Sequence, residues 1–318
     1  MTPLIEIKNL KKYFEVGKNK RLHAVDGINL EIYPNEILGL VGESGCGKST
    51  LGRTLAGLYD KTEGEVIFKG KALPSSYESK DFVNLSREIQ MIFQDPYSSL
   101  NPRMTVREII AEGPRLSGLW SEKEVSEKTQ AWLVRVGLSA DHASRYPHEF
   151  SGGQRQRIGI ARALAMEPKF VICDEPISAL DVSIQAQIIN LLAELKEKFG
   201  LTLLFIAHDL SMVRYVSNRM AVMYLGSIVE LGVSDEIFFE PQHPYTQLLV
   251  SSNPEPDPIQ EKQRVHIQLN GEIPTPINLG VGCRFAGRCP KVVSRCKEET
   301  PLLKKTKNHH FVACHLVD

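Results

Sequence analysis

The pattern of hydrophobic and polar positions in the first part of this chain indicates β-strands. Apolar and polar residues alternate at 4–7, 28–32 and 65–68. A period of two is typical of a strand that buries one face and exposes the other. We therefore expect antiparallel strands in residues 1 to about 36 and in 63–70.

Elsewhere in the chain, the apolar residues form continuous runs instead of alternating. Such runs occur at 36–41, 170–174 and 201–207. Between the last two, apolar residues from Ile184 to Leu195 recur at helical spacing, and Gly200 ends the pattern. Buried strands that alternate with helices predict an α/β fold, with a mostly parallel sheet covered on both faces.

Two further segments complete the expected organisation. Residues 104–145 are rich in helix formers and poor in strand signals, and 220–231 predict a hairpin that turns at Gly226-Ser227. The proline-rich stretch 253–258 is typical of a linker. We therefore expect a first domain at 1–251 and a second, smaller domain at 252–318.

Composition narrows the class of protein. The 318 residues include 38 Lys and Arg and 38 Asp and Glu, so the formal net charge is zero. Without a basic excess to neutralise phosphates along a strand, we expect no nucleic-acid partner. No run approaches the roughly 18 apolar residues of a membrane span, and the N-terminus lacks the pattern of a signal peptide. We expect the chain to stay in the cytosol.

The strongest chemical signal is the run from Gly42 to Ser49, which fits G-x-x-x-x-G-K-[ST]. A buried strand precedes it and a helix pattern follows it, which is the context that a phosphate-binding loop needs. Its glycines let the backbone N–H groups face phosphate oxygens at the helix N-terminus. Lys48 is expected to bind the β and γ phosphates, and Ser49 to bind Mg²⁺.

Carboxylates follow the next buried strand. Asp174 and Glu175 come directly after residues 170–173, and α/β sheets bind ligands at the carboxyl ends of their strands. We expect Asp174 to hold Mg²⁺ opposite Ser49, and Glu175 to polarise a water for attack on the γ phosphate. A strand that merely meets a polar turn is the alternative.

Three other polar features could join this site. His208 follows the strand at 201–207 and is expected near the γ phosphate, although a capping histidine is the alternative. Gln94 ends an apolar run and could accept from Mg²⁺-bound water, or cap that strand. The run 151–154 opens a helix with two glycines, so its amides could bind an anion, or Ser151 could be a plain N-cap.

Together these motifs resemble the ATP-binding cassette (ABC) ATPases in order and approximate spacing, over about residues 4–235. The resemblance implies a P-loop ATPase with an antiparallel β subdomain and a helical subdomain at about 96–165. It implies that Glu175 and His208 are catalytic, that Tyr13 stacks on adenine, and that Ser49, Gln94 and Asp174 hold Mg²⁺. The implied ATP contacts are Tyr13, Gly42, Ser44, Gly45, Cys46, Gly47, Lys48, Ser49, Thr50 and Gln94.

The same resemblance implies a head-to-tail dimer. Each ATP lies between one chain's phosphate loop and the partner's signature run, which here is Ser151, Gly152, Gly153 and Gln154. This arrangement would explain why the signature lies so far from the loop in sequence.

Two segments are similar to the ATPase subunits of oligopeptide and dipeptide importers: 93–102, and 242–246 with the proline-rich tail behind it. The resemblance implies a second, non-identical ATPase subunit, two membrane permease subunits and, indirectly, an extracytoplasmic binding protein. The chain would be peripheral, on the cytoplasmic face of the inner membrane. The alternatives are an importer of nickel or oligosaccharides, a soluble ABC ATPase of repair or translation, and a metal-binding redox sensor.

Four of the six cysteines lie after position 280: Cys283, Cys289, Cys296 and Cys314. Clustered thiols in a cytosolic chain suggest metal, either zinc or an iron–sulfur cluster, and packing is the alternative. The resemblance favours a [4Fe–4S] cluster. The basic residues around these thiols are expected to stabilise thiolates: Arg284, Arg288, Lys291 and Arg295.

Overall fold

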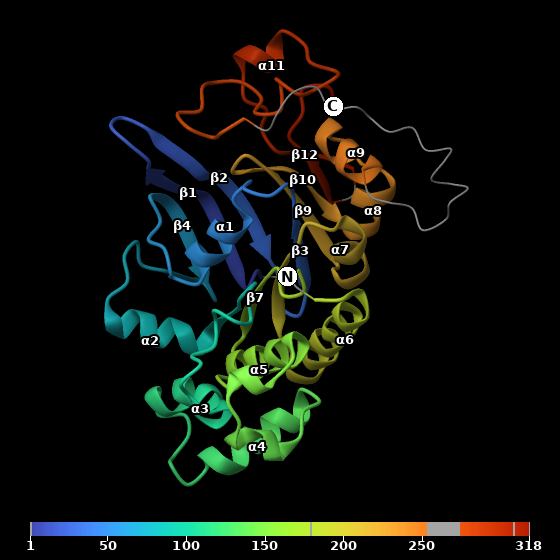
Figure 1. Ribbon diagram of the computed structural model, residues 1–318. Helices are drawn as coiled ribbons and strands as arrows, with labels where there is room; N and C mark the ends of the chain where they lie inside the picture. Colours follow the sequence, from blue (N-terminus) through green and yellow to red (C-terminus); the bar gives the residue numbers. More distant parts are fainter. Residues whose placement is uncertain (1, 179, 253–273, 308, 318) are drawn as a thin grey trace, which may run out of the picture. The chain divides into compact units, whose positions relative to one another are not determined.

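The computed structural model describes residues 2–178, 180–252, 274–307 and 309–317; the predicted linker at 253–258 lies outside these ranges. The chain forms two compact units. The first combines residues 1–76 with 206–318, and the second comprises residues 77–205. Figure 1 follows the chain through both units.

An antiparallel sheet opens the first unit, as the alternating pattern predicts. Its strands are β1 (Ile5–Glu15), β2 (Arg21–Ile32), β4 (Glu63–Phe68) and β5 (Lys71–Ala72), in the order β2-β1-β4-β5. Ile5, Ile7 and Leu10 are buried on one face of β1. The expected strands at the start of the chain are confirmed.

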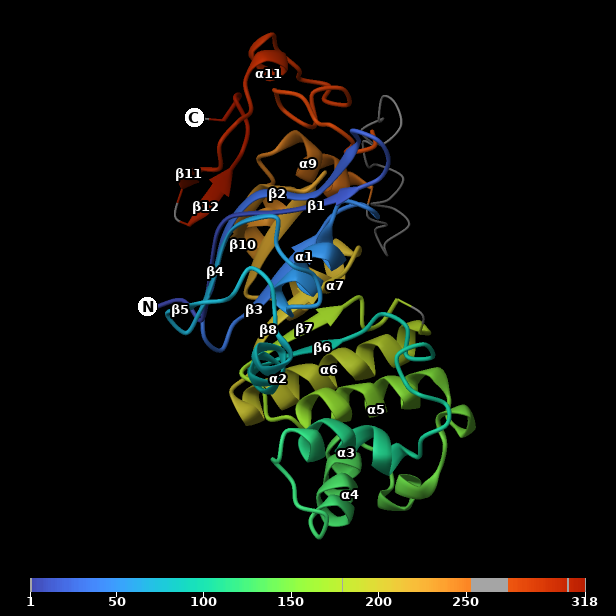
Figure 2. The ribbon, with the colours of Figure 1, turned by 90° about the vertical axis from the view of Figure 1, so that its left-hand side faces the viewer.

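A second sheet of the first unit carries the phosphate loop. Strand β3 (Ile37–Val41) is fully buried and pairs in parallel with β9 (Arg219–Tyr224), which forms the expected hairpin with β10 (Ser227–Val233). The C-terminal strands extend this sheet, because β12 (His310–Val312) pairs with β10 and β11 (Lys304–Lys307) pairs with β12. The C-terminal strands therefore belong to the same sheet as β3, the strand that leads into the phosphate loop (Figure 2).

Short helices complete the first unit: α1 (Lys48–Leu55), α7 (Leu210–Val216), α8 (Ser234–Phe239), α9 (Pro244–Ser251) and α11 (Arg295–Glu298). Helix α1 begins at the end of the phosphate loop, as predicted.

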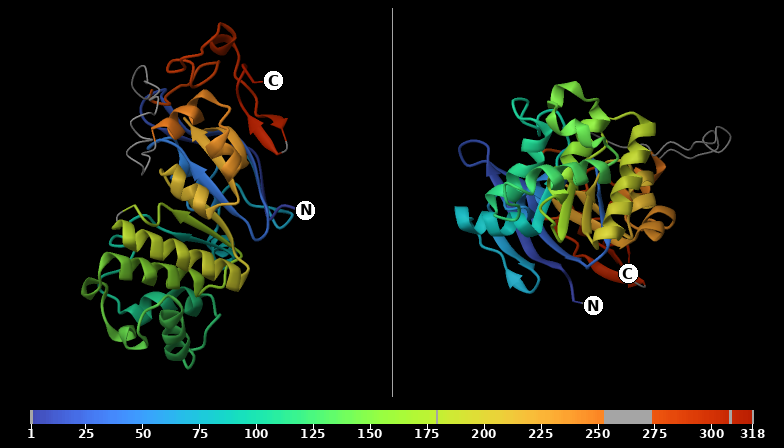
Figure 3. Two further views of the ribbon diagram at one scale, coloured as in Figure 1. Left: turned by 90° about the vertical axis from the view of Figure 1, so that its right-hand side faces the viewer. Right: turned by 90° about the horizontal axis from the view of Figure 1, so that it is seen from below.

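The second unit is mainly helical. Its elements are α2 (Ser79–Glu88), β6 (Ile89–Ile92), α3 (Val106–Leu116), α4 (Val125–Arg135), 3₁₀ turns at Ala140–Ser144 and Pro147–Glu149, α5 (Gly152–Leu164), β7 (Phe170–Asp174), α6 (Val182–Phe199) and β8 (Thr202–Ile206). β6 and β7 pair in parallel. Figures 2 and 3 show α5 beside α6, with α3 and α4 nearby. The predicted helical stretch 104–145 is confirmed.

Local chemistry explains where several of these helices begin and end. Thr105 and Glu108 form a capping box that starts α3. Ser151 and Gln154 form another that starts α5. Gly200, in the left-handed conformation, ends α6. No helix within the described ranges is long and apolar enough to cross a membrane.

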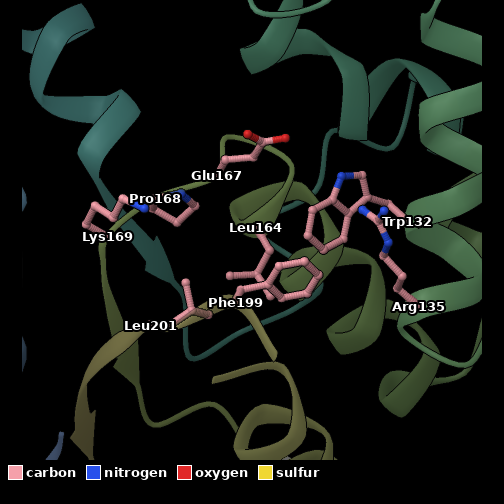
Figure 4. Close-up of a pocket in the computed structure, with 8 residues that line it drawn as sticks. All are labelled: Trp132, Arg135, Leu164, Glu167, Pro168, Lys169, Phe199 and Leu201. Atoms are coloured by element: carbon pink, nitrogen blue, oxygen red, sulfur yellow. The ribbon is translucent and has the colours of Figure 1, made fainter. Parts of the chain in front are cut away.

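A cavity of about 310 Å³ lies in the second unit (Figure 4). Trp132 and Phe199 line it with ring centroids 5.4 Å apart, and the Arg135 guanidinium lies 4.7 Å from the Trp132 ring. None of the predicted site residues lines this cavity, so we do not assign it to nucleotide binding.

The carboxylate of Glu230 joins the C-terminal strands to α9. It is fully buried in β10 and lies 2.7 Å from His310 Nε2 in β12. It also accepts from the backbone N–H groups of Gln242, at 2.7 Å, and His243, at 3.0 Å. A buried carboxylate is tolerated only when its oxygens are satisfied in this way.

His243 gives this region a predicted pH dependence. Burial lowers its pKa to about 4, against the effect of Glu230, while an unfolded histidine titrates near 6.5. Between pH 6.5 and 4, His243 therefore binds a proton in the unfolded chain but not in the folded chain. We expect this contribution to stability to be complete above pH 6.5 and to be lost between pH 6.5 and 4, by about 3 kcal/mol.

Urea unfolding from pH 7.5 to 4.5 would measure this loss. His243→Asn is the matched control, because asparagine keeps an acceptor for the Tyr245 N–H but does not titrate. The wild type should lose more stability than the variant over this range. Parallel pH profiles for the two proteins would contradict the assignment.

Candidate nucleotide-binding site

Glycine is required in the phosphate loop because other backbone lies against it. Gly42 and Gly47 have φ values of 153° and 108°. A Cβ at Gly47 would lie 1.9 Å from the carbonyl oxygen of Ala24 in β2, and one at Gly42 would lie 2.2 Å from that of Met223 in β9. The loop is therefore packed between two strands.

The ammonium group of Lys48 lies over this loop. Its Nζ donates to the carbonyl oxygens of Gly42, at 2.7 Å, and Glu43, at 3.1 Å, and lies 3.9 Å from Cys46 Sγ. The side chain is 4% exposed. Because α1 begins at Lys48, Ser49 and Thr50 stand in its first turn, where the positive end of the helix dipole attracts anions. This arrangement suits phosphate.

Two residues far away in sequence hold Glu43 at the loop. The Glu43 N–H donates to the hydroxyl of Tyr245, in α9, at 2.9 Å. Its carboxylate accepts two bonds from Arg288, at 2.7 and 3.0 Å. The sequence predicted neither contact. The expected role of Arg288 beside thiolates is wrong, because its guanidinium pairs with Glu43.

Tyr13 has well-defined partners in the first unit. Its hydroxyl donates to Asp26 at 2.5 Å, and its ring packs on His23 with centroids 4.1 Å apart. Burial and this bond raise the pKa of Tyr13. Burial alone would raise the pKa of Asp26, but the bonds from Tyr13 and His23 and the charge of Arg284 lower it. Tyr13 therefore packs locally within the first unit, and stacking on adenine stays a prediction.

His208 lies close to the end of β3. The preceding residue, Ala207, donates its N–H to the carbonyl of Leu40 at 3.2 Å, two residues before Gly42. The His208 side chain is exposed, and Asp209 caps α7 by accepting from Met212 N. The structure therefore brings Tyr13, the phosphate loop and His208 into one unit.

The other predicted catalytic residues lie in the second unit. Asp174 ends β7 and is buried. Glu175 follows it with φ of 45°, and its Oε2 accepts from Gln94 Nε2 at 2.9 Å. The amide and carboxylate are therefore adjacent, as a shared role around water and Mg²⁺ requires.

The signature run forms the start of α5, as predicted. The Ser151 hydroxyl accepts from Gln154 N, and Gln154 Oε1 accepts from Ser151 N at 3.0 Å. A Cβ at Gly153 would lie 2.6 Å from Ile184 Cγ2 in α6. Glycine at position 153 therefore lets α5 and α6 approach each other closely. The Ser151 N-cap does not prevent the backbone amides of this run from binding an anion, so both interpretations of the run are compatible.

The cysteine prediction is not supported. No group of three or more His, Cys, Asp or Glu side chains in the part of the chain that is described is placed to hold a metal ion. Burial raises the pKa of Cys283 to about 11 and also raises the pKa of Cys289 and Cys314. These thiols are therefore protonated near neutral pH in the metal-free chain, and a metal would bind by displacing their protons.

The basic residues near the cysteines mostly serve other partners. Arg284 pairs with Asp26, and Arg295 pairs with Glu299, although the charge of Arg284 also interacts with Cys283 and that of Arg295 with Cys296. Lys291 Nζ donates to Gln247 Oε1 at 3.2 Å, although its charge also lowers the pKa of Cys289 against the effect of burial.

Comparison with known proteins agrees with this geometry. Residues 25–178 match the family model described as ABC transporter, and residues 229–296 match the C-terminal region of oligopeptide/dipeptide transporters. The chain is 54% identical over 315 residues to the putative oligopeptide transport ATP-binding protein YkfD of Bacillus subtilis, covering 99% of this chain and 95% of that protein. It is 51% identical over 324 residues to the oligopeptide transport ATP-binding protein OppF of Escherichia coli, covering 99% and 96%.

Among solved structures, the chain resembles the dimeric ATP-binding cassette MJ0796 in a post-hydrolysis state with ADP and phosphate. The TM-score is 0.66 at 28% identity, over 72% of this chain and 98% of that chain. The predicted P-loop ATPase fold is confirmed.

Gly47→Ala tests the packing of the phosphate loop. We expect it to lower the thermal unfolding midpoint of the nucleotide-free protein by several degrees more than Gly45→Ala does. Both glycines have positive φ, so both variants carry about 1–2 kcal/mol of backbone strain. Only the Cβ at position 47 meets backbone; at position 45 nothing lies within 4 Å. Equal shifts for the two variants would contradict this account of the loop.

Proposed function

The chain belongs to the ABC transporter family, in the oligopeptide and dipeptide group of its ATP-binding subunits, and we propose that it powers the import of di- and oligopeptides. It is an ATPase whose hydrolysis is coupled to transport. We infer the peptide substrate from the names of its relatives, which are oligopeptide transport ATP-binding proteins.

One observation carries this proposal: the buried Lys48 ammonium lies over the glycine loop that opens α1. The positive charge of Lys48, the backbone N–H groups of the loop and the helix dipole all favour binding of phosphate at this place. We assign ATP to this loop, with Mg²⁺ held by Ser49, Asp174 and Gln94. Glu175 polarises the attacking water, His208 contacts the γ phosphate, and Tyr13 stacks on adenine.

Assembly follows from the position of the signature run. Ser151, Gly152, Gly153 and Gln154 start a helix whose N-terminus suits phosphate. We propose that they contact ATP on a partner ATPase in a head-to-tail dimer, and that the partner is a different chain. Two membrane permease subunits would bind this pair on the cytoplasmic face of the membrane, and an extracytoplasmic binding protein would deliver the peptide.

Peptide uptake tests the proposal. The complex, reconstituted in vesicles with its permeases, companion ATPase and binding protein, should take up a labelled dipeptide or pentapeptide only with ATP. Glu175→Gln keeps the shape of the side chain but removes its charge, so turnover should fall by at least about 10²-fold while ATP binding is retained. Lys48→Ala should instead weaken ATP binding.

Two outcomes would contradict the proposal. ATP hydrolysis stimulated by nickel or an oligosaccharide, with none by peptides, would change the substrate class. Near-wild-type turnover of Glu175→Gln in the assembled complex would remove Glu175 from its role.

We propose the [4Fe–4S] cluster separately from this function. Zinc is the alternative, because four thiolates can also hold a single Zn²⁺ ion tetrahedrally. The electrostatic influence of Cys296, Cys314 and Cys289 on Cys283 is consistent with four neighbouring thiols.

Iron and sulfide analysis of anaerobically purified protein tests this hypothesis. We expect about four of each per chain, with a brown colour that Cys289→Ser removes and Cys46→Ser, in the phosphate loop, leaves unchanged. A colourless protein without iron would leave the four cysteines as packing residues.

A further inference from the structure

The C-terminal segment 283–288 contacts the nucleotide-binding residues at two separate points. It forms a compact turn, because Ala286 N donates to Cys283 O and Arg288 N donates to Phe285 O, both at 3.0 Å. Three side chains of this turn, Arg284, Phe285 and Arg288, extend to the core of the first unit.

Arg288 holds the phosphate loop. It is 5% exposed and binds both oxygens of Glu43, with a further bond of 3.4 Å to Tyr224. A bidentate guanidinium–carboxylate pair fixes the plane as well as the position of the carboxylate. With the Glu43 N–H bonded to Tyr245, both the backbone and the side chain of this loop residue are held from outside the loop.

Phe285 anchors the turn in the core of the first unit. It is 1% exposed, and its ring centroid lies 5.3 Å from that of Tyr224 and 5.5 Å from that of Tyr245. These two tyrosines are the residues that contact Arg288 and Glu43. Burial of this aromatic cluster ties the position of Arg288 to the sheet that carries the loop.

Arg284 makes the second contact of the turn, with Asp26 beside Tyr13. Its Nη2 donates to Asp26 Oδ2 at 2.6 Å, and its Nη1 donates to the carbonyl of Leu225. Asp26 in turn accepts from Tyr13, and its Oδ2 lies 3.1 Å from His23 Nδ1. The ring of His23 packs against that of Tyr13. Arg284 therefore fixes the carboxylate that orients the aromatic side chain predicted to stack on adenine.

We propose that Arg284 and Arg288 are positioning residues for ATP, with Arg288 ordering the phosphate loop and Arg284 ordering Tyr13. The inference rests on the proposed roles of the loop and Tyr13. An ordered site binds more tightly because less conformational entropy is lost on binding. The C-terminal segment is then part of the nucleotide-binding apparatus.

Calorimetric titration of the full chain with two probes separates the two roles. Mg-tripolyphosphate has phosphates but no base, so it reports on the loop, while Mg-ATP reports on both points. Arg288→Gln should weaken binding of both probes by about tenfold, in the range of typical couplings. Arg284→Gln should weaken Mg-ATP by a similar factor and leave tripolyphosphate unchanged. Arg295→Gln is the control, because Arg295 is exposed and pairs with nearby Glu299.

A double-mutant cycle tests whether Arg288 acts through Glu43. Glu43→Gln alone should weaken both probes about tenfold, and adding Arg288→Gln should cause little further loss, since both changes remove one interaction. Additive losses would overturn the proposal, as would wild-type affinity in Arg288→Gln. If Arg288→Gln fails to fold, Arg288→Lys can replace it, because lysine keeps the charge but not the bidentate geometry. Arg288→Lys should still weaken the binding of both probes, and unchanged binding would overturn the proposal.

Failure of the inference is distinguishable from failure of the proposed function. Wild-type protein that binds neither probe would reject the ATP site itself. Wild-type protein that binds both, with unchanged affinity in the variants, would reject only the roles of the two arginines.

Discussion

The close approach of the phosphate loop to neighbouring backbone is the constraint on which the rest of the site depends. Carbonyl groups of β2 and β9 leave no room for a Cβ at Gly47 or Gly42. The loop can therefore lie this close to both strands only because these two positions are glycine. Strand β3 and helix α1 supply its two ends, and Lys48 bonds back to its carbonyls. The conformation of the phosphate loop is in this sense a property of the first unit as a whole.

The C-terminal residues belong to that unit. Strand β12 extends the sheet that carries the loop, Glu230 ties it to the start of α9, and α9 provides the Tyr245 hydroxyl for Glu43. A segment that the proline-rich stretch marked as a separate domain is therefore joined to the loop through buried hydrogen bonds. Its proposed influence on ATP affinity follows from those contacts.

The sequence predicted most elements because their signals are local. Alternation marked β1 and β4, continuous apolar runs marked β7 and β8, and the glycine loop marked the start of α1. The Gln94–Glu175 contact was compatible with the proposed chemistry but could not be derived, since 81 residues separate the two positions. Arg288 was assigned to neighbouring cysteines because sequence shows what is close along the chain. Its true partner, Glu43, lies 245 residues away, and only the fold brings the two together.

A structure of the assembled membrane complex would show whether the ATP site is shared between this chain and its companion ATPase. Electron cryo-microscopy of the complex carrying Glu175→Gln, with Mg-ATP, should trap the bound state. We expect ATP between this chain's phosphate loop and the companion's signature run, with Ser151–Gln154 of this chain at the companion's nucleotide. ATP contacted by this chain alone, with no signature run beside it, would contradict the account.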